Sequence, residues 1–133
     1  MIATRLSSLE SMLAGDHHRL EREFQVIVTR AYGGDFQLLE AEWLAFQTAL
    51  LGHLDAEERN MIPELAKDRP GEAQTLLDEH TNIRIKLLQL GVDLDLHCLS
   101  AERVEAFVEA LRAHAHREEN IFYPWVDRQI AGC

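Results

Sequence analysis

Long apolar runs are missing from this chain. No stretch approaches the roughly 18 consecutive apolar residues of a membrane-spanning helix, so we expect neither a membrane span nor a membrane partner. The region from Met1 to Gly15 contains an arginine, serines and glutamates in place of the apolar core of a secretory signal. We therefore expect the protein to reside in the cytoplasm.

Cysteine and basic residues are also scarce. The two cysteines, Cys98 and Cys133, provide neither a disulfide framework nor a Cys-x-x-Cys zinc pair, so two free thiols are expected. Acidic residues outnumber basic ones by 23 to 13, and the net charge of −10 argues against binding to nucleic acid or to an anionic membrane. The excess negative charge fits either bound multivalent cations or a solvated acidic surface.

Helical spacing of apolar residues is the dominant pattern. Apolar residues recur at alternating steps of three and four through four segments, which indicates one buried face on each of four helices. We predict helices over about 16–32, 36–62, 72–90 and 100–122, packed as an all-α, up-down-up-down four-helix bundle. A chain of 133 residues fits one such domain, spanning residues 1–133.

Turn-forming and capping residues separate these helices. Gly33-Gly34 ends the first and Gly91 ends the third, while Asp35 and Ser100 are the expected N-caps of the second and fourth.

Both ends of the chain add a short segment to the predicted bundle. Gly15-Asp16 has the character of a break and restart, so the residues before it form a short N-terminal arm. Pro124 ends or kinks the last helix, and a short C-terminal helix follows it.

Six polar residues interrupt the apolar stripes, and they are His17, His53, Glu57, His80, His114 and Glu118. An ionised group removed from water costs several kcal/mol unless an opposite charge compensates it. Estimated from the rise per residue, the four histidines lie at similar heights in the bundle, and each glutamate lies one turn from its histidine. Six such groups in one core require a cation, and the number of groups suggests more than one.

An internal repeat supports a two-metal centre. His53-x-x-x-Glu57-Glu58 precedes Pro63, and His114-x-x-x-Glu118-Glu119 precedes a proline at the same offset. Mixed imidazole and carboxylate ligands suit iron, manganese or zinc. The chain contains no Glu-x-x-His of ferritin-like proteins, no His-Glu-x-x-His of zincin proteases and no glycine-rich phosphate loop.

The order His, His-x-x-x-Glu, His, His-x-x-x-Glu over residues 13–124 resembles the hemerythrin-like (HHE) family, as do the Asp16-His17 and Glu79-His80 pairs. The resemblance implies a four-helix bundle around two non-haem iron ions with an oxo or hydroxo bridge, with zinc or manganese as alternatives. By this analogy His17 and His53 bind one iron. His80 and His114 bind the other, and the two glutamates bridge both.

Two departures set the chain apart from the oxygen-carrying members of that family. Arg84 occupies the place of a second histidine on the third helix, and Glu118 stands where carriers have an aspartate one residue later. The six-ligand set resembles the bacterial branch, for which peroxide decomposition, nitric oxide binding and oxygen or iron sensing are described.

We therefore expect a di-iron protein that binds dioxygen, peroxide or nitric oxide, with catalase-like peroxide decomposition as the enzymatic version. The alternatives are a non-catalytic module for sensing or iron storage, and a structural zinc bundle. We expect a monomer or a weak homodimer.

The remaining polar residues have simpler expected roles. His18 and His116 lie off the stripes and should face solvent, whereas His97 lies in a connection as a surface or capping residue. Glu21 is the candidate for a spare ligand, because it lies one turn after His17. Three acids are either outer acceptors that orient the ligand imidazoles or solvated surface residues, namely Glu58, Glu79 and Glu119.

Overall fold

The computed structural model describes residues 2–122, 124–125 and 128, and it describes the side chains of these residues apart from 2–15 and 122. Every regular element in the described part of the chain is helical, which confirms the predicted all-α class. The elements are α1 (Ile2–Tyr32), α2 (Leu39–Asn60), α3 (Ile62–Asp68), α4 (Pro70–Asp95), α5 (Ala101–Arg117) and a π-helical turn, η1 (Glu118–Phe122).

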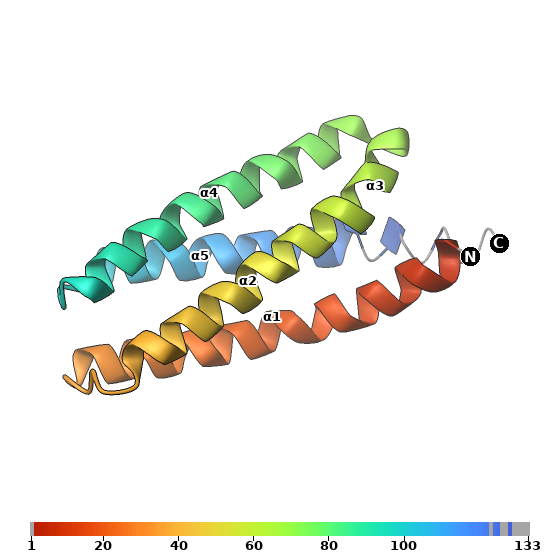
Figure 1. Ribbon diagram of the computed structural model, residues 1–133. Coiled ribbons are helices and arrows are strands. Elements are labelled where there is room, and N and C mark those ends of the chain that lie inside the picture. Colours follow the sequence, from red (N-terminus) through yellow and green to blue (C-terminus); the bar gives the residue numbers. More distant parts are fainter. Residues whose placement is uncertain (1, 123, 126–127, 129–133) are drawn as a thin grey trace.

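The four long helices run alternately in opposite directions, as Figure 1 shows. Helix α1 packs mainly on α2, and α5 packs mainly on α4, while α2 also contacts α4 and α1 contacts α5. The short helix α3 joins α2 to α4 at the end of the bundle where η1 also lies. In the described part of the chain, no helix combines the length and the apolar character needed to cross a membrane.

The sequence predicts correctly that glycine ends α1 and that Ser100 caps the start of α5. The amide of Gly34, at φ 74°, donates to Ala31 and the amide of Asp35 donates to Arg30, which closes α1 in a Schellman motif. The hydroxyl of Ser100 accepts a hydrogen bond from the amide of Arg103 and caps α5.

The predicted break at Gly15-Asp16 is wrong, because α1 continues through it. A single glycine costs a helix only about 1 kcal/mol, and Asp16 is engaged with His53 instead of capping a new helix.

The expected capping role of Asp35 is also wrong. Its carboxylate accepts a hydrogen bond from Arg30, and α2 starts only at Leu39 without a side-chain cap.

The third long helix is longer than predicted. Gly91 lies inside α4, and a Cβ at this position would come within 3.3 Å of Trp43 Nε1. The glycine therefore lets the indole pack closely against the helix, which continues to Asp95.

Two apolar clusters fill the bundle on either side of a polar layer. The larger contains Leu20, Phe24, Phe46, Leu50, Ile83, Leu87 and Phe107, among others. The smaller, around α3, contains Met61, Ile62, Leu65, Ala73, Leu76 and Trp125. Four of the predicted ligands lie between members of the two clusters in sequence, namely Glu57, His80, His114 and Glu118. The predicted C-terminal helix lies largely outside the described residues, as does Cys133, whereas Cys98 is an exposed free thiol.

Candidate metal centre

The six predicted ligands converge in the layer between the apolar clusters. Two groups of side chains have ligand atoms within 4.8 Å of one another. The first contains His17 and His53, and the second contains His80 and His114. Both groups include Glu57 and Glu118, which are fully buried and lie between the two pairs of histidines.

The histidines point their Nε2 atoms toward these two carboxylates. The shortest distances are His17 to Glu118 at 2.9 Å, His80 to Glu57 at 3.0 Å, His53 to Glu57 at 3.4 Å and His114 to Glu118 at 3.4 Å. The geometry therefore provides four imidazole nitrogens around a pair of shared carboxylates.

A second set of carboxylates contacts the opposite side of the imidazoles. Helices α1, α2 and α4 each supply one acid to the histidine of the next long helix along the chain, and η1 supplies the fourth acid to α1. From Nδ1 to the nearest oxygen the pairs are His53 with Asp16 at 3.2 Å, His80 with Glu58 at 2.6 Å, His114 with Glu79 at 2.9 Å and His17 with Glu119 at 4.0 Å. The last pair joins η1, which continues directly from α5, to α1, so the four contacts form a closed ring, which we call the outer acid ring.

Arginines hold three members of the outer acid ring. These pairs are Arg84 with Glu58 at 2.7 Å, Arg117 with Glu79 at 2.7 Å, and Arg19 with Asp16. Burial raises the pKa of Glu58 and Glu79, but the nearby arginine and histidine outweigh burial and hold both pKa values below the usual range. Both side chains are therefore ionised acceptors.

The outer acid ring determines which imidazole nitrogen is free to bind a cation. A carboxylate at Nδ1 requires an N–H there, so the Nε2 atom of a neutral ring carries a lone pair. His80 Nε2 and His114 Nε2 lie 3.0 Å apart, which places two such lone pairs against each other. In the described part of the chain, His53 Nε2, both oxygens of Glu57 and Glu118 Oε2 are buried without a hydrogen bond of good geometry. A cation would satisfy these atoms together.

Burial and neighbouring charges set the protonation of the cluster. Burial lowers the pKa of His17, and repulsion by His53 adds to this effect, so that it falls to about 4. Burial raises the pKa of Glu57, but contacts with three imidazoles outweigh burial and hold it well below the usual range. Neutral imidazole and ionised carboxylate are the forms that bind metal ions.

The donor set fits a first-row transition metal. Imidazole nitrogen with carboxylate oxygen suits iron, manganese or zinc, whereas magnesium and calcium prefer oxygen alone. The residues present therefore fit the kind of ion that the sequence predicts.

The other predicted roles have mixed outcomes. His18 and His116 are exposed, as predicted. His97 ends α4 at φ 53° and stacks on Phe36 with 3.8 Å between the ring centroids, which agrees with a capping residue. Glu21 is not part of either ligand group, because its carboxylate accepts a hydrogen bond of 2.7 Å from Arg112 Nε.

Sequence reasoning missed Asp16 as an acceptor for a ligand histidine, although it identified the equivalent role for Glu79. Both acids directly precede a ligand histidine in the chain, and both contact the histidine of the following helix. The repeated acid-His pair was the available signal, but the pattern of Asp16 also matches a helix cap.

The chain matches the family model described as "Hemerythrin HHE cation binding domain" over residues 8–126. Neither the search of curated proteins nor the search of solved structures found a significant match.

Proposed function

Because the chain belongs to the hemerythrin HHE cation-binding domain family, we propose that its two ligand groups hold two iron ions and that this centre binds dioxygen, peroxide or nitric oxide. The observation that carries the proposal is the sharing of Glu57 and Glu118 by two pairs of histidines. Carboxylates in that position can bridge two ions, so the paired arrangement favours binding of two ions over binding of one.

The residues of the chain hold and orient the ions. Glu57 and Glu118 set the spacing of the pair, and the outer acid ring keeps each Nε2 atom directed inward. Iron held by the two pairs of histidines and the two shared carboxylates would supply reversible one-electron chemistry and would bind a small ligand. Catalase-like decomposition of hydrogen peroxide is the enzymatic form of this proposal.

The decisive experiment combines metal analysis with absorption spectra of the purified protein. We expect two iron ions per chain, charge-transfer bands that change when hydrogen peroxide or nitric oxide is added, and loss of both in Glu57→Ala. Oxygen evolution from peroxide identifies the enzyme. The same spectral changes without oxygen evolution identify a binding or sensing module. Zinc alone, in protein from iron-replete cells, would disprove the proposed redox function.

A further inference from the structure

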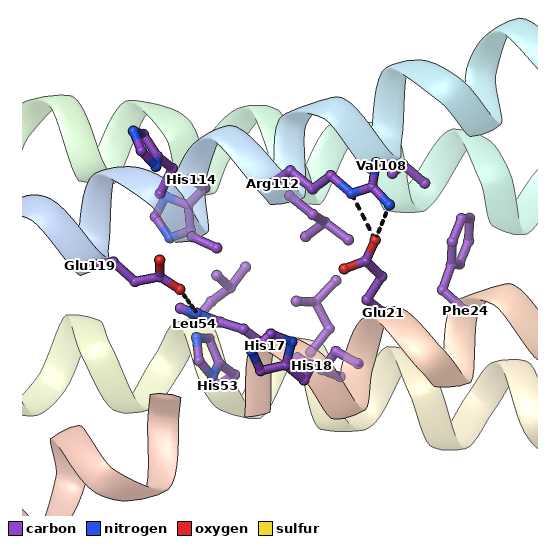
Figure 2. Close-up of a pocket in the computed structure, with 15 residues that line it drawn as sticks. His17, His18, Glu21, Phe24, His53, Leu54, Val108, Arg112, His114 and Glu119 are labelled. Carbon is purple, nitrogen blue, oxygen red and sulfur yellow. Dashed lines mark hydrogen bonds and ion pairs between the residues drawn. The ribbon is translucent and has the colours of Figure 1, made fainter. Parts of the chain in front are cut away.

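A cavity of about 260 Å³ lies between α1, α2 and α5, beside the candidate metal centre. Most of its exposed wall surface is apolar and comes from residues that include Leu20, Phe24, Leu50, Leu54, Val108 and Leu111, while histidines, two acids and Arg112 complete the lining. Figure 2 shows the imidazoles of His17, His53 and His114 near one end of the cavity and Phe24 at the other. The cavity therefore extends from the imidazoles of the candidate site along an apolar wall.

The cavity lies beside the longest contact of the outer acid ring. The contact of Glu119 with His17 measures 4.0 Å, compared with 2.6–3.2 Å for the other three. His17 is also the most exposed ligand histidine, with a side chain 12% exposed, compared with 0–4% for the others. A molecule in the cavity would thus reach the metal centre from this side.

The cavity is larger than a diatomic ligand or hydrogen peroxide requires. An apolar cavity of about 150 Å³ in a protein interior already stays dry and accepts a benzene ring. A larger space with mainly apolar walls therefore suits an alkyl or aryl group of ring size.

The charged residues that line the cavity indicate whether its ligand is charged or neutral. An ion pair between Glu21 and Arg112 joins α1 to α5 across the cavity, as Figure 2 shows. Glu119 lies on the other side of the opening, and the chain carries a net charge of −10. Among the described residues that line the cavity, the one arginine is already paired with Glu21, so its charge is not available to an anionic ligand. A neutral molecule is favoured.

We propose that the cavity binds an organic hydroperoxide, with its alkyl or aryl group against the apolar wall and its peroxide end toward His17 and His53. This proposal rests on the proposed function, since it names the class of peroxide that the centre receives. The proposal concerns binding only. The apolar wall would make the site bind organic peroxides in preference to hydrogen peroxide.

The test uses the iron-loaded protein and compares cumene hydroperoxide with hydrogen peroxide. We expect the spectral change to saturate at a lower concentration of cumene hydroperoxide, by about tenfold or more. Val108→Phe should fill the cavity and abolish this preference. Val92→Phe is the matched control, because Val92 lies exposed on α4, and it should alter neither response.

A second measurement depends neither on turnover nor on a variant. Benzene alone should bind to the native protein in a saturable manner, seen as shifts of Val108 and Leu111 methyl signals in NMR spectra. Absence of benzene binding would overturn the proposal, as would equal responses of native protein and Val108→Phe to cumene hydroperoxide. Failure of the proposed function would look different, since the protein would then lack iron or not respond to hydrogen peroxide.

Discussion

At the scale of single residues, the site depends on the direction of each imidazole. Every histidine of the two candidate ligand groups has a shared carboxylate near Nε2 and a member of the outer acid ring near Nδ1. At His53, His80 and His114, where this acid is within hydrogen-bond distance of Nδ1, the arrangement selects the tautomer whose Nε2 lone pair faces the interior and raises the basicity of the ring. The identity of the acid therefore matters as much as that of the histidine.

The shared glutamates should be indispensable for metal binding. Glu57→Ala or Glu118→Ala removes a carboxylate from both ligand groups at once, so metal content should fall from full occupancy to nearly none. Metal analysis of the purified variants measures this. The exposed histidines His18 and His116 provide matched controls, and their replacement by alanine should leave the metal content unchanged. Equal losses in all four variants would show that the ligand assignment is mistaken.

The outer acid ring should tune affinity without being essential. Glu79→Gln keeps an acceptor near His114 but removes its charge, so we expect metal affinity to fall by about 10- to 100-fold. Competition against a chelator of known affinity measures the change. Glu105→Gln, an exposed position on α5, removes the same charge far from the ring and should have no effect. A similar loss in both variants would mean that overall charge, and not orientation of His114, is responsible.

At the scale of elements, the helices are held in place at their ends. The Schellman motif after α1 uses Gly34, whereas the equivalent motif after α4 places His97 in the left-handed region. The ring of His97 stacks on Phe36, which joins the two connections at one end of the bundle. These contacts position α1, α2, α4 and α5 so that their ligands meet in one layer.

Replacement of glycine by alanine should change the free energy of unfolding in opposite directions at Gly52 and Gly34. Gly52 is exposed within α2, and a Cβ there would meet nothing within 4 Å. Gly52→Ala should therefore raise the free energy of unfolding by about 0.5–1 kcal/mol. Gly34→Ala should lower it by about 1–2 kcal/mol, because φ is positive there. Urea denaturation measures both, and a destabilising Gly52→Ala would show that α2 needs flexibility beside His53.

At the scale of the whole molecule, the polar layer separates two apolar clusters that could otherwise form one core. Without bound cations this layer holds two buried carboxylates and four imidazoles. The negative charge of the carboxylates must then be balanced by protons on the imidazoles. Burial lowers the pKa of His114, but contacts with Glu57 and Glu79 outweigh it, so that its pKa is raised. Protons and metal ions thus compete for the same site, and metal binding releases protons.

Metal removal should lower the melting temperature of the whole bundle. A ligand at one hundred times its Kd contributes about 2.7 kcal/mol, which corresponds to a shift of about 10 °C for a domain of this size. Calorimetry before and after treatment with a chelator measures the shift. Glu57→Ala serves as the control, because the chelator should have no effect on a variant that holds no metal. Identical melting of native holoprotein and apoprotein would contradict the link between metal and folding.

Much of the site was predictable because its determinants are local. A histidine in an apolar stripe and a glutamate one turn later are visible in the spacing alone, since the period of a helix is constant. The same argument placed His18 and His116 on the surface. Helix ends were harder, because Asp16 and Gly91 carry the local signature of a boundary but serve contacts with other helices.

The sequence by itself determined the helical class, the buried faces and the six inward positions, because each follows from residues within a few turns of one another. Only the tertiary structure decided which acid serves which histidine, since the outer acid ring joins residues that are 22 to 37 positions apart within three of its pairs. It also decided where the cavity opens, because that depends on how closely α1 approaches α5. Distances between helices depend on the packing of all their side chains, and no local pattern encodes them.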